Sequence, residues 1–221
     1  MPSFFELKLD TLPPQGVTFL INSGAQYTNT QAVNLTISTS DTPSDGYTMK
    51  LWGIQGAATE GAAAWETFSP SKAVNLTAGD GLKTISVKIR DNVLNESAAA
   101  TAQITLDTAA PAVSITGPDV NIISKVAEKD TASFSFMSDK VFTEYTVRVV
   151  PATTSLHTAG TQIPTTGGSV NMSGSNGSGY PADTAINCTV KGADLETASA
   201  GDGVKIVKVF VKSQSNVWSE A

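Results

Sequence analysis

One stretch of the chain occurs twice, and this repeat limits the folds that the chain can adopt. The segment from Gly79 to Arg90 returns, 122 positions later, as the segment from Gly201 to Lys212. Each copy begins with a Gly-Asp-Gly turn and continues with an apolar residue at nearly every second position. Such alternation after a turn is typical of a β-strand with one buried face. We therefore predict two strands whose buried faces carry Ile85, Val87 and Ile89 in the first copy and Val207, Val209 and Val211 in the second.

Two further pairs of segments match, at spacings of 98 and 97 positions. The segment Tyr47–Trp52 resembles Tyr145–Val150, and Leu7–Pro14 resembles Ile104–Pro111. A short strand pattern follows each member of the second pair. Three separate matches indicate that the chain contains two copies of one structural unit. The segment Ile104–Pro111 is then the junction between the copies.

Length and composition agree with two small β-domains. The chain has 221 residues, whereas one sandwich needs roughly 100. Hydrophobic residues make up 40% of it and charged residues only 15%, against roughly 25% charged in an average globular protein. Because surface helices usually carry Glu, Lys and Arg, this composition favours strands and turns.

The repeated motifs resemble the tandem bacterial immunoglobulin-like repeats of bacterial surface proteins and bacteriophage virion proteins. In that family a strand ending in Leu-Asp-Thr-x-x-Pro closes one repeat and opens the next. The resemblance covers most of residues 4–111 and, more loosely, 112–221. It implies an all-β fold with two immunoglobulin-like antiparallel β-sandwiches in series. We expect an N-terminal strand and linker at 1–15, a first domain at 16–110, and a second domain at 111–221 with a long Gly/Ser-rich loop at 151–183.

The strand pattern of the two repeats is unequal. In the first we expect strands at 17–21, 32–38, 46–53, 65–68, 73–77, 82–90 and 101–107. In the second we expect strands at 112–116, 131–137, 144–150, 185–191 and 204–212. The second repeat thus lacks a last strand, while residues 4–10 match a last strand that has no sandwich before it.

This mismatch suggests that a strand is donated, because an uncovered sheet edge exposes unpaired backbone groups. We hypothesise that Phe4 to Asp10, with Phe5, Leu7 and Leu9 on one face, adds to an exposed edge of another subunit or a neighbouring protein, beside the 204–212 strand. Two alternatives remain open. Residues 4–10 fold back on their own domain as an edge strand, or residues 213–221 form a short closing strand.

Two other features suggest contact surfaces. Ile206 and Phe210 lie where the first repeat has polar residues, so apolar side chains are expected on a face that should be wet. The alternative is that the longer second repeat covers this face with its own loop. Tyr180 ends the Gly/Ser-rich tract, for which we expect a mobile or partner-ordered loop anchored by this ring, or an idle insertion.

Residues suited to catalysis are scarce. The single cysteine, Cys188, excludes a disulfide within the chain, and the single histidine, His157, excludes a His-rich zinc site. Cys188 lies in an alternating run, so we expect a buried core thiol. No Gly-x-Ser-x-Gly motif accompanies the histidine.

The carboxylates show no clear constellation either. Asp41 and Asp45, and Asp91 with Asn92 and Asn95, have the oxygen ligands that calcium prefers, but turns use the same residues. Glu66, Asp194 and Glu196 offer no pairing for glycoside hydrolysis. We predict no catalytic, cofactor-binding or metal site.

Net charge and hydropathy restrict the partners. A net charge of −6 gives no electrostatic footprint for nucleic acid. No stretch approaches about 18 apolar residues, which predicts no membrane insertion, and the N-terminus shows no signal peptide. Trp52 and Trp65 are expected in the first core, or alternatively on an exposed platform for sugar stacking.

These observations favour a non-enzymatic structural protein of a bacteriophage virion: a capsid or tail decoration, an adaptor or a fibre-base component. It would assemble in the host cytoplasm and bind other virion proteins or copies of itself. The alternative is a carbohydrate-binding or adhesive module of a bacterial surface protein that recognises a host glycan through Trp52, Trp65 or Tyr180.

Overall fold

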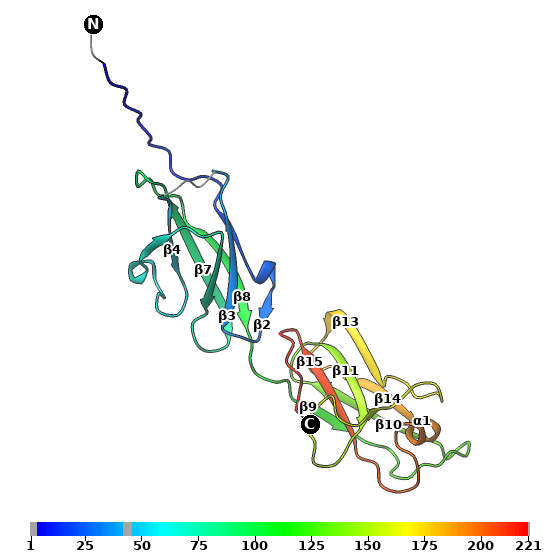
Figure 1. Cartoon of the computed structure of the whole chain (residues 1–221). Coiled ribbons are helices and arrows are strands. Elements are labelled where there is room, and N and C mark those ends of the chain that lie inside the picture. The colour runs from blue at the N-terminus through cyan, green and yellow to red at the C-terminus, as the bar shows by residue number, and fades with distance from the viewer. Residues whose placement is uncertain (1–3, 42–45, 221) are drawn as a thin grey trace. The chain divides into compact units, whose positions relative to one another are not determined.

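The computed structural model describes residues 4–41 and 46–220, and nearly all of its regular structure is β-strand. The chain divides into two compact units, Met1–Thr108 and Ala109–Ala221. Each unit is an antiparallel β-sandwich with its own apolar core (Figure 1). The expectation of an all-β chain with two immunoglobulin-like sandwiches is confirmed.

The first unit packs a three-stranded sheet against a five-stranded sheet. The smaller sheet has the order β1 (Thr18–Ile21), β3 (Ala32–Ser38), β6 (Ser71–Asn75). The larger has the order β2 (Tyr27–Thr28), β8 (Ala100–Leu106), β7 (Gly81–Arg90), β4 (Thr48–Trp52), β5 (Trp65–Thr67). All neighbours are antiparallel except β2 and β8. Two short 3-10 helices lie at Asn22–Gly24 and Glu60–Ala62.

The core of the first unit follows the period-two alternation of its strands. Strand β3 alternates fully between exposed and buried residues. The predicted inner residues of β7, Ile85, Val87 and Ile89, are all fully buried. The last strand, β8, adds Ile104 and Leu106 to the same core, each only 1% exposed. Each of these buried aliphatic side chains contributes about 1.5–3 kcal/mol relative to exposure.

The second unit has a three-stranded sheet and a four-stranded sheet. The first has the order β14 (Ile186–Lys191), β10 (Thr131–Ser138), β9 (Val113–Thr116). In the second, β12 (Thr161–Gln162) and β13 (Ser173–Tyr180) both pair with β11 (Phe142–Val149). Strand β15 (Val207–Ser213) pairs with β11 along its whole length. Because β15 takes one edge of β11, strands β12 and β13 share the other.

The Gly/Ser-rich tract corrects our expectation of a mobile loop, because it forms strand β13 against β11. The pairing uses backbone groups and needs no apolar side chain. Gly174 also has a packing role: a Cβ at this position would overlap the ring of Tyr145 and the hydroxyl of Tyr180. The missing side chain therefore lets two aromatic rings cover the strand.

A short helix, α1 (Gly192–Ala198), follows β14 and was not expected from the sequence. Its Asp194 is buried, and the carboxylate accepts hydrogen bonds from the backbone of Gly167 at 2.6 Å and Ser169 at 2.8 Å. The helix thus fastens the loop before β13. None of the helices in the described part of the chain is long and apolar enough to span a membrane.

Candidate strand-binding groove

The second unit leaves one edge of β15 without a strand partner. In the first unit, β7 pairs with β4 through residues 86–90 and with β8 through residues 81–87. Among the described strands, β15 pairs only with β11. It also begins at Val207, three residues later than the repeat predicts, because no second neighbour holds residues 204–206 in a ladder. The exposed edge is therefore the place that β8 occupies in the first unit.

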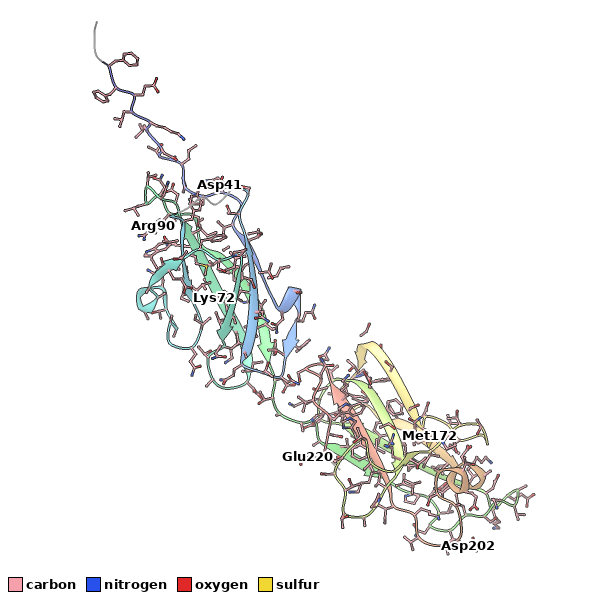
Figure 2. The ribbon with its side chains drawn as sticks, in the orientation of Figure 1. Asp41, Lys72, Arg90, Met172, Asp202 and Glu220 are labelled. Carbon is pink, nitrogen blue, oxygen red and sulfur yellow. The ribbon has the colours of Figure 1, made fainter. Side chains whose placement is uncertain are left out.

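An apolar groove lies beside this edge. Its volume is about 610 Å³, and its walls come from β9, β10, β15 and the loop 118–123. The apolar lining includes Ile115, Ile122, Phe134, Val207 and Val209. Asp202, labelled in Figure 2, lies in the turn that forms part of the wall.

Exposure shows that this groove lacks a cover. Val207 corresponds to Ile85 of the first unit, yet Val207 is half-buried whereas Ile85 is fully buried. Ile115 of β9 is 48% exposed, while Phe19 of β1 is 6% exposed. In the first unit, β8 removes these positions from water. An uncovered apolar groove next to an unpaired strand edge is a site for an added strand.

The N-terminal segment is complementary to this groove, because it carries apolar side chains and belongs to no sheet. Figures 1 and 2 show residues 4–10 leaving the first sandwich as an extended segment. Its large side chains are 84–87% exposed, namely Phe4, Phe5, Leu7 and Leu9. The alternative in which this segment folds back as an edge strand of its own domain is therefore wrong.

The second alternative was a closing strand at 213–221, and the described residues 214–220 form no strand. After β15 the chain turns, and residues 217–219 bond back to the end of β15 through the Lys212–Trp218 bridge and two backbone hydrogen bonds, Ser213 N to Val217 O and Ser219 N to Val211 O, without forming a strand. This turn repeats the one after β7, where a bridge joins Arg90 to Glu96. It returns the chain to the start of the open edge without covering it.

Two of the predicted interface residues have other roles. Phe210 is fully buried, because the loop 151–160 crosses its face of the sheet. Lys208 Nζ donates to Thr154 O at 2.6 Å and Arg148 Nε to Ala159 O at 2.8 Å, which fastens that loop. The prediction of an exposed Phe210 is wrong, and the covering loop was the correct alternative. Ile206 remains 37% exposed.

Tyr180 is likewise not a free anchor. Its ring stacks on Phe142 at 4.9 Å between centroids and meets Tyr145 edge-on at 5.5 Å. The side chain is half-buried at the margin of the second core. Its position at the end of β13, paired with Phe142, explains this role.

The expectation that Trp52 and Trp65 lie in the first core is wrong. Met49 and Leu51 are the buried residues of β4, so the alternation turns Trp52 to the outer face of the sheet. Trp65 is half-buried on β5, and the Arg90 guanidinium lies 4.2 Å from its ring centroid. Neither ring belongs to the first core. The sequence also gave no sign that His157 stacks on Trp218, with ring centroids 4.3 Å apart.

The titratable groups singled out in the sequence serve the fold. Cys188 is buried, and burial raises the pKa of its thiol to about 12. Burial disfavours ionisation of Asp91, but hydrogen bonds from Asn95, Val93 and Leu94 outweigh it and lower the pKa of the carboxyl. Asp194 behaves in the same way, through hydrogen bonds from Ser169, Gly167 and Thr166.

The remaining carboxylates make structural contacts. Asp41 accepts a hydrogen bond from the backbone of Gln15 at 2.7 Å, and Glu66 pairs with Lys72 at 2.7 Å. Asp45 lies outside the described residues. Within residues 4–41 and 46–220, no group of three or more His, Cys, Asp or Glu side chains is placed to hold a metal ion.

Comparison with known proteins finds only distant structural similarity. No protein-family model matches the chain, and no curated protein matches it. Among solved structures, fibronectin(III)-like modules of CbhA from Clostridium thermocellum are similar at 11% identity over 91% of this chain and 89% of that one, with a TM-score of 0.44. A carbohydrate-binding module of the β-sandwich superfamily is similar at 14% identity over 96% of this chain and 100% of that one, with a TM-score of 0.35.

The D00-D0 domain of intimin is similar at 12% identity over 87% of this chain and 91% of that one, with a TM-score of 0.33. Identities of this size give no basis for transferring what those proteins bind. None of the three is described as a bacteriophage protein. By its own sheets and cores, the chain is a tandem immunoglobulin-like β-sandwich protein.

Proposed function

We propose that this chain is a non-enzymatic structural protein that joins its neighbours by strand addition, as a decoration, adaptor or fibre-base component of a bacteriophage virion. The observation that carries the proposal is the unpaired edge of β15 beside an apolar groove. The resemblance of the repeats to virion and surface proteins supports the setting. The role is then mechanical: the protein presents a sheet edge.

An added strand would stabilise the complex in two ways. Backbone groups at an open edge gain partners, and apolar residues in the groove leave water. Burial of exposed apolar area contributes about 25 cal/mol per Å². Val207 and Ile115 are partly exposed residues of the groove that an added strand would remove from water.

The groove is tested by supplying the missing strand within the same chain. The nine residues of Ala100–Thr108 are copied directly after Ala221, the point at which the turn after β15 matches the turn after β7. We expect amide exchange in β15 to slow and the unfolding temperature of the second unit to rise. The matched control carries the same extension with aspartate at the positions copied from Ile104 and Leu106. Equal behaviour of the two extensions would overturn the proposal.

The virion setting is tested by the genes beside the coding sequence. Neighbours that encode capsid, portal or tail proteins are expected. Neighbours that encode export or surface-anchoring functions would contradict the virion setting and support the adhesive alternative.

That second candidate function, carbohydrate binding, is favoured by one observation. Trp52 and Trp65 are on the outer face of the five-stranded sheet and not in the core. Aromatic rings on an outer face can stack on sugars. Binding to a glycan array that is lost in both Trp52→Ala and Trp65→Ala, with an unchanged circular dichroism spectrum, would support it. An array without specific binding would exclude it.

A further inference from the structure

We propose that residues 4–10 of a second copy of this chain fill the groove of the second unit, so that copies join head to tail. This inference rests on the proposed function, because it names the strand that the groove accepts. The donor is the exposed N-terminal segment, and the acceptor is the edge formed by residues 202–208. Such a contact uses two different surfaces and therefore produces chains or rings of copies.

The donor segment matches β8, the strand that pairs with the equivalent edge of β7 in the first unit. Leu7-Lys8-Leu9-Asp10-Thr11 aligns with Ile104-Thr105-Leu106-Asp107-Thr108. Ile104 and Leu106 are the inner residues of β8 and are 1% exposed. Leu7 and Leu9 take these two positions in the alignment, yet they are 86% and 84% exposed. The segment thus has the side chains of a final strand, and in this structure they are exposed.

The first unit also supplies the register of the contact. Ile104 pairs with Lys83, and Leu106 pairs with Gly81. Applied to the second unit, this register places Leu7 opposite Lys205 and Leu9 opposite Gly203. The same shift places Phe5 opposite Val207, because Ala102 pairs with Ile85. Phe5 is larger than the alanine it replaces, and the groove of about 610 Å³ has room for its ring.

A polar contact fixes the end of the strand in the first unit. Thr108 donates to the Asp80 carboxylate through its backbone N–H at 3.1 Å and its hydroxyl at 2.9 Å. The equivalent pair across the proposed contact is Thr11 of the donor and Asp202 of the acceptor. Asp202 already lines the groove. A hydrogen bond between Thr11 and Asp202 would therefore set the register at this end of the added strand, in addition to the packing of its side chains.

A second copy is favoured over the same chain by the ends of the first unit. The donor segment leaves beside the turn after β7, where Asn95 Nδ2 donates to Asp10 O at 3.3 Å. The chain continues towards the second unit from Thr108, which is bonded to Asp80 just before β7 begins. These two points are separated by the ten residues of β7, which span about 30 Å at roughly 3.3 Å per residue. The donor therefore starts at the end of the unit away from the connection.

Cysteine pairs placed in this register test the contact with the complete chain. One preparation carries Leu7→Cys, and a second carries Lys205→Cys, and the two are mixed and oxidised. We expect a disulfide-linked dimer of the two variants. The native Cys188 does not interfere, because it is buried.

The matched control places the acceptor cysteine at Lys83, the residue of the first unit that corresponds to Lys205. Lys83 is at the same place in the repeat, and both lysines donate from Nζ to a backbone carbonyl, Lys83 to Ala78 O and Lys205 to Ala200 O. Its edge is already filled by β8. Mixing Leu7→Cys with Lys83→Cys should give no disulfide-linked dimer of the two variants. Equal cross-linking of the two mixtures would overturn the proposal.

The unmodified protein gives an independent measurement. Its mass in sedimentation should rise with concentration, and the double variant Leu7→Asp/Leu9→Asp should stay monomeric. A monomer at every concentration, or a Leu7→Cys/Lys205→Cys chain that closes on itself, would overturn the head-to-tail contact. If the nine-residue extension still stabilises the second unit, the groove accepts a different strand and the proposed function stands. If the extension also fails, both proposals fall.

Discussion

Ser219 and Val211 hold each other by two hydrogen bonds: Ser219 N donates to Val211 O at 2.8 Å, and Val211 N donates to Ser219 Oγ at 3.0 Å. Ser97 and Ile89 are joined in the same way in the first unit, at 2.9 and 3.0 Å. In the first unit this turn leads directly into β8. The second unit therefore has the turn that precedes a final strand.

Removal of this hydroxyl should weaken the second unit. In Ser219→Ala the buried N–H of Val211 loses its acceptor, which costs about 1–3 kcal/mol. Amide exchange resolved by residue should speed up in β15 and not in β7. Ser97→Ala is the matched variant, and it should speed up amide exchange in β7 and not in β15. Equal loss of protection in both units from either variant would contradict this local role.

Gly174 and Gly177 should respond differently to the same substitution. A Cβ on Gly174 would overlap the ring of Tyr145 and the hydroxyl of Tyr180, whereas a Cβ on Gly177 would meet nothing within 4 Å. Gly174→Ala should destabilise the second unit by about 1–3 kcal/mol. Gly177→Ala should change its stability by less than about 0.5 kcal/mol. Urea unfolding measures both, and an equal cost for the two variants would count against the packing role.

The Cys188 thiol should be unreactive in the folded protein. Burial raises its pKa from 9.0 to about 12, so the thiolate is scarce at pH 8. A chromogenic disulfide reagent should react with Cys188 of the native chain much more slowly than with the chain unfolded in urea. The folded state keeps its proton between pH 9 and about 12 while the unfolded thiol loses it, so stability falls as the pH rises through this range. Rapid native labelling at pH 8 would refute the expectation.

His157 should make the second unit sensitive to mild acid. Burial, and then the charges of Arg148 and Lys212, lower the pKa of this side chain below its usual 6.5. The unfolded chain therefore binds a proton at a pH where the folded chain does not, so stability decreases as the pH falls below 6.5. The decrease ends below the lowered pKa. Because His157 is the only histidine, His157→Gln should abolish this dependence, and fluorescence of the stacked Trp218 should report it. A pH profile shared by both proteins would argue against it.

The alternation of apolar residues was enough to predict most of the fold. Ile85, Val87 and Ile89 were assigned to the buried face of β7 from their spacing alone, and all three are buried. Period-two alternation carries this information because successive side chains of a strand point to opposite faces. The same rule fails for Trp52, whose expected core place came from the analogy with other sandwiches and not from the alternation of β4.

The repeat also indicated the candidate site, because Leu7–Thr11 matches the end of β8, the final strand of the first sandwich. Exposure of Phe5, Leu7 and Leu9, and the unpaired edge of β15, are what the structure adds. Sequence alone left two alternatives for these residues, since a strand pattern does not say which edge it joins. Pairing depends on which backbone groups remain free after all nearer strands have paired.

The sequence by itself determined that this chain forms two related sandwiches, since the repeat and the alternation are local properties of neighbouring residues. Only the tertiary structure decided that Ser173–Tyr180 is a strand, because its backbone bonds to β11 and its glycines leave no side-chain pattern. It also decided that Phe210 is buried, through a loop that starts after β11 and returns across the sheet. Both outcomes depend on groups far apart in the chain, which a local pattern of residue types does not record.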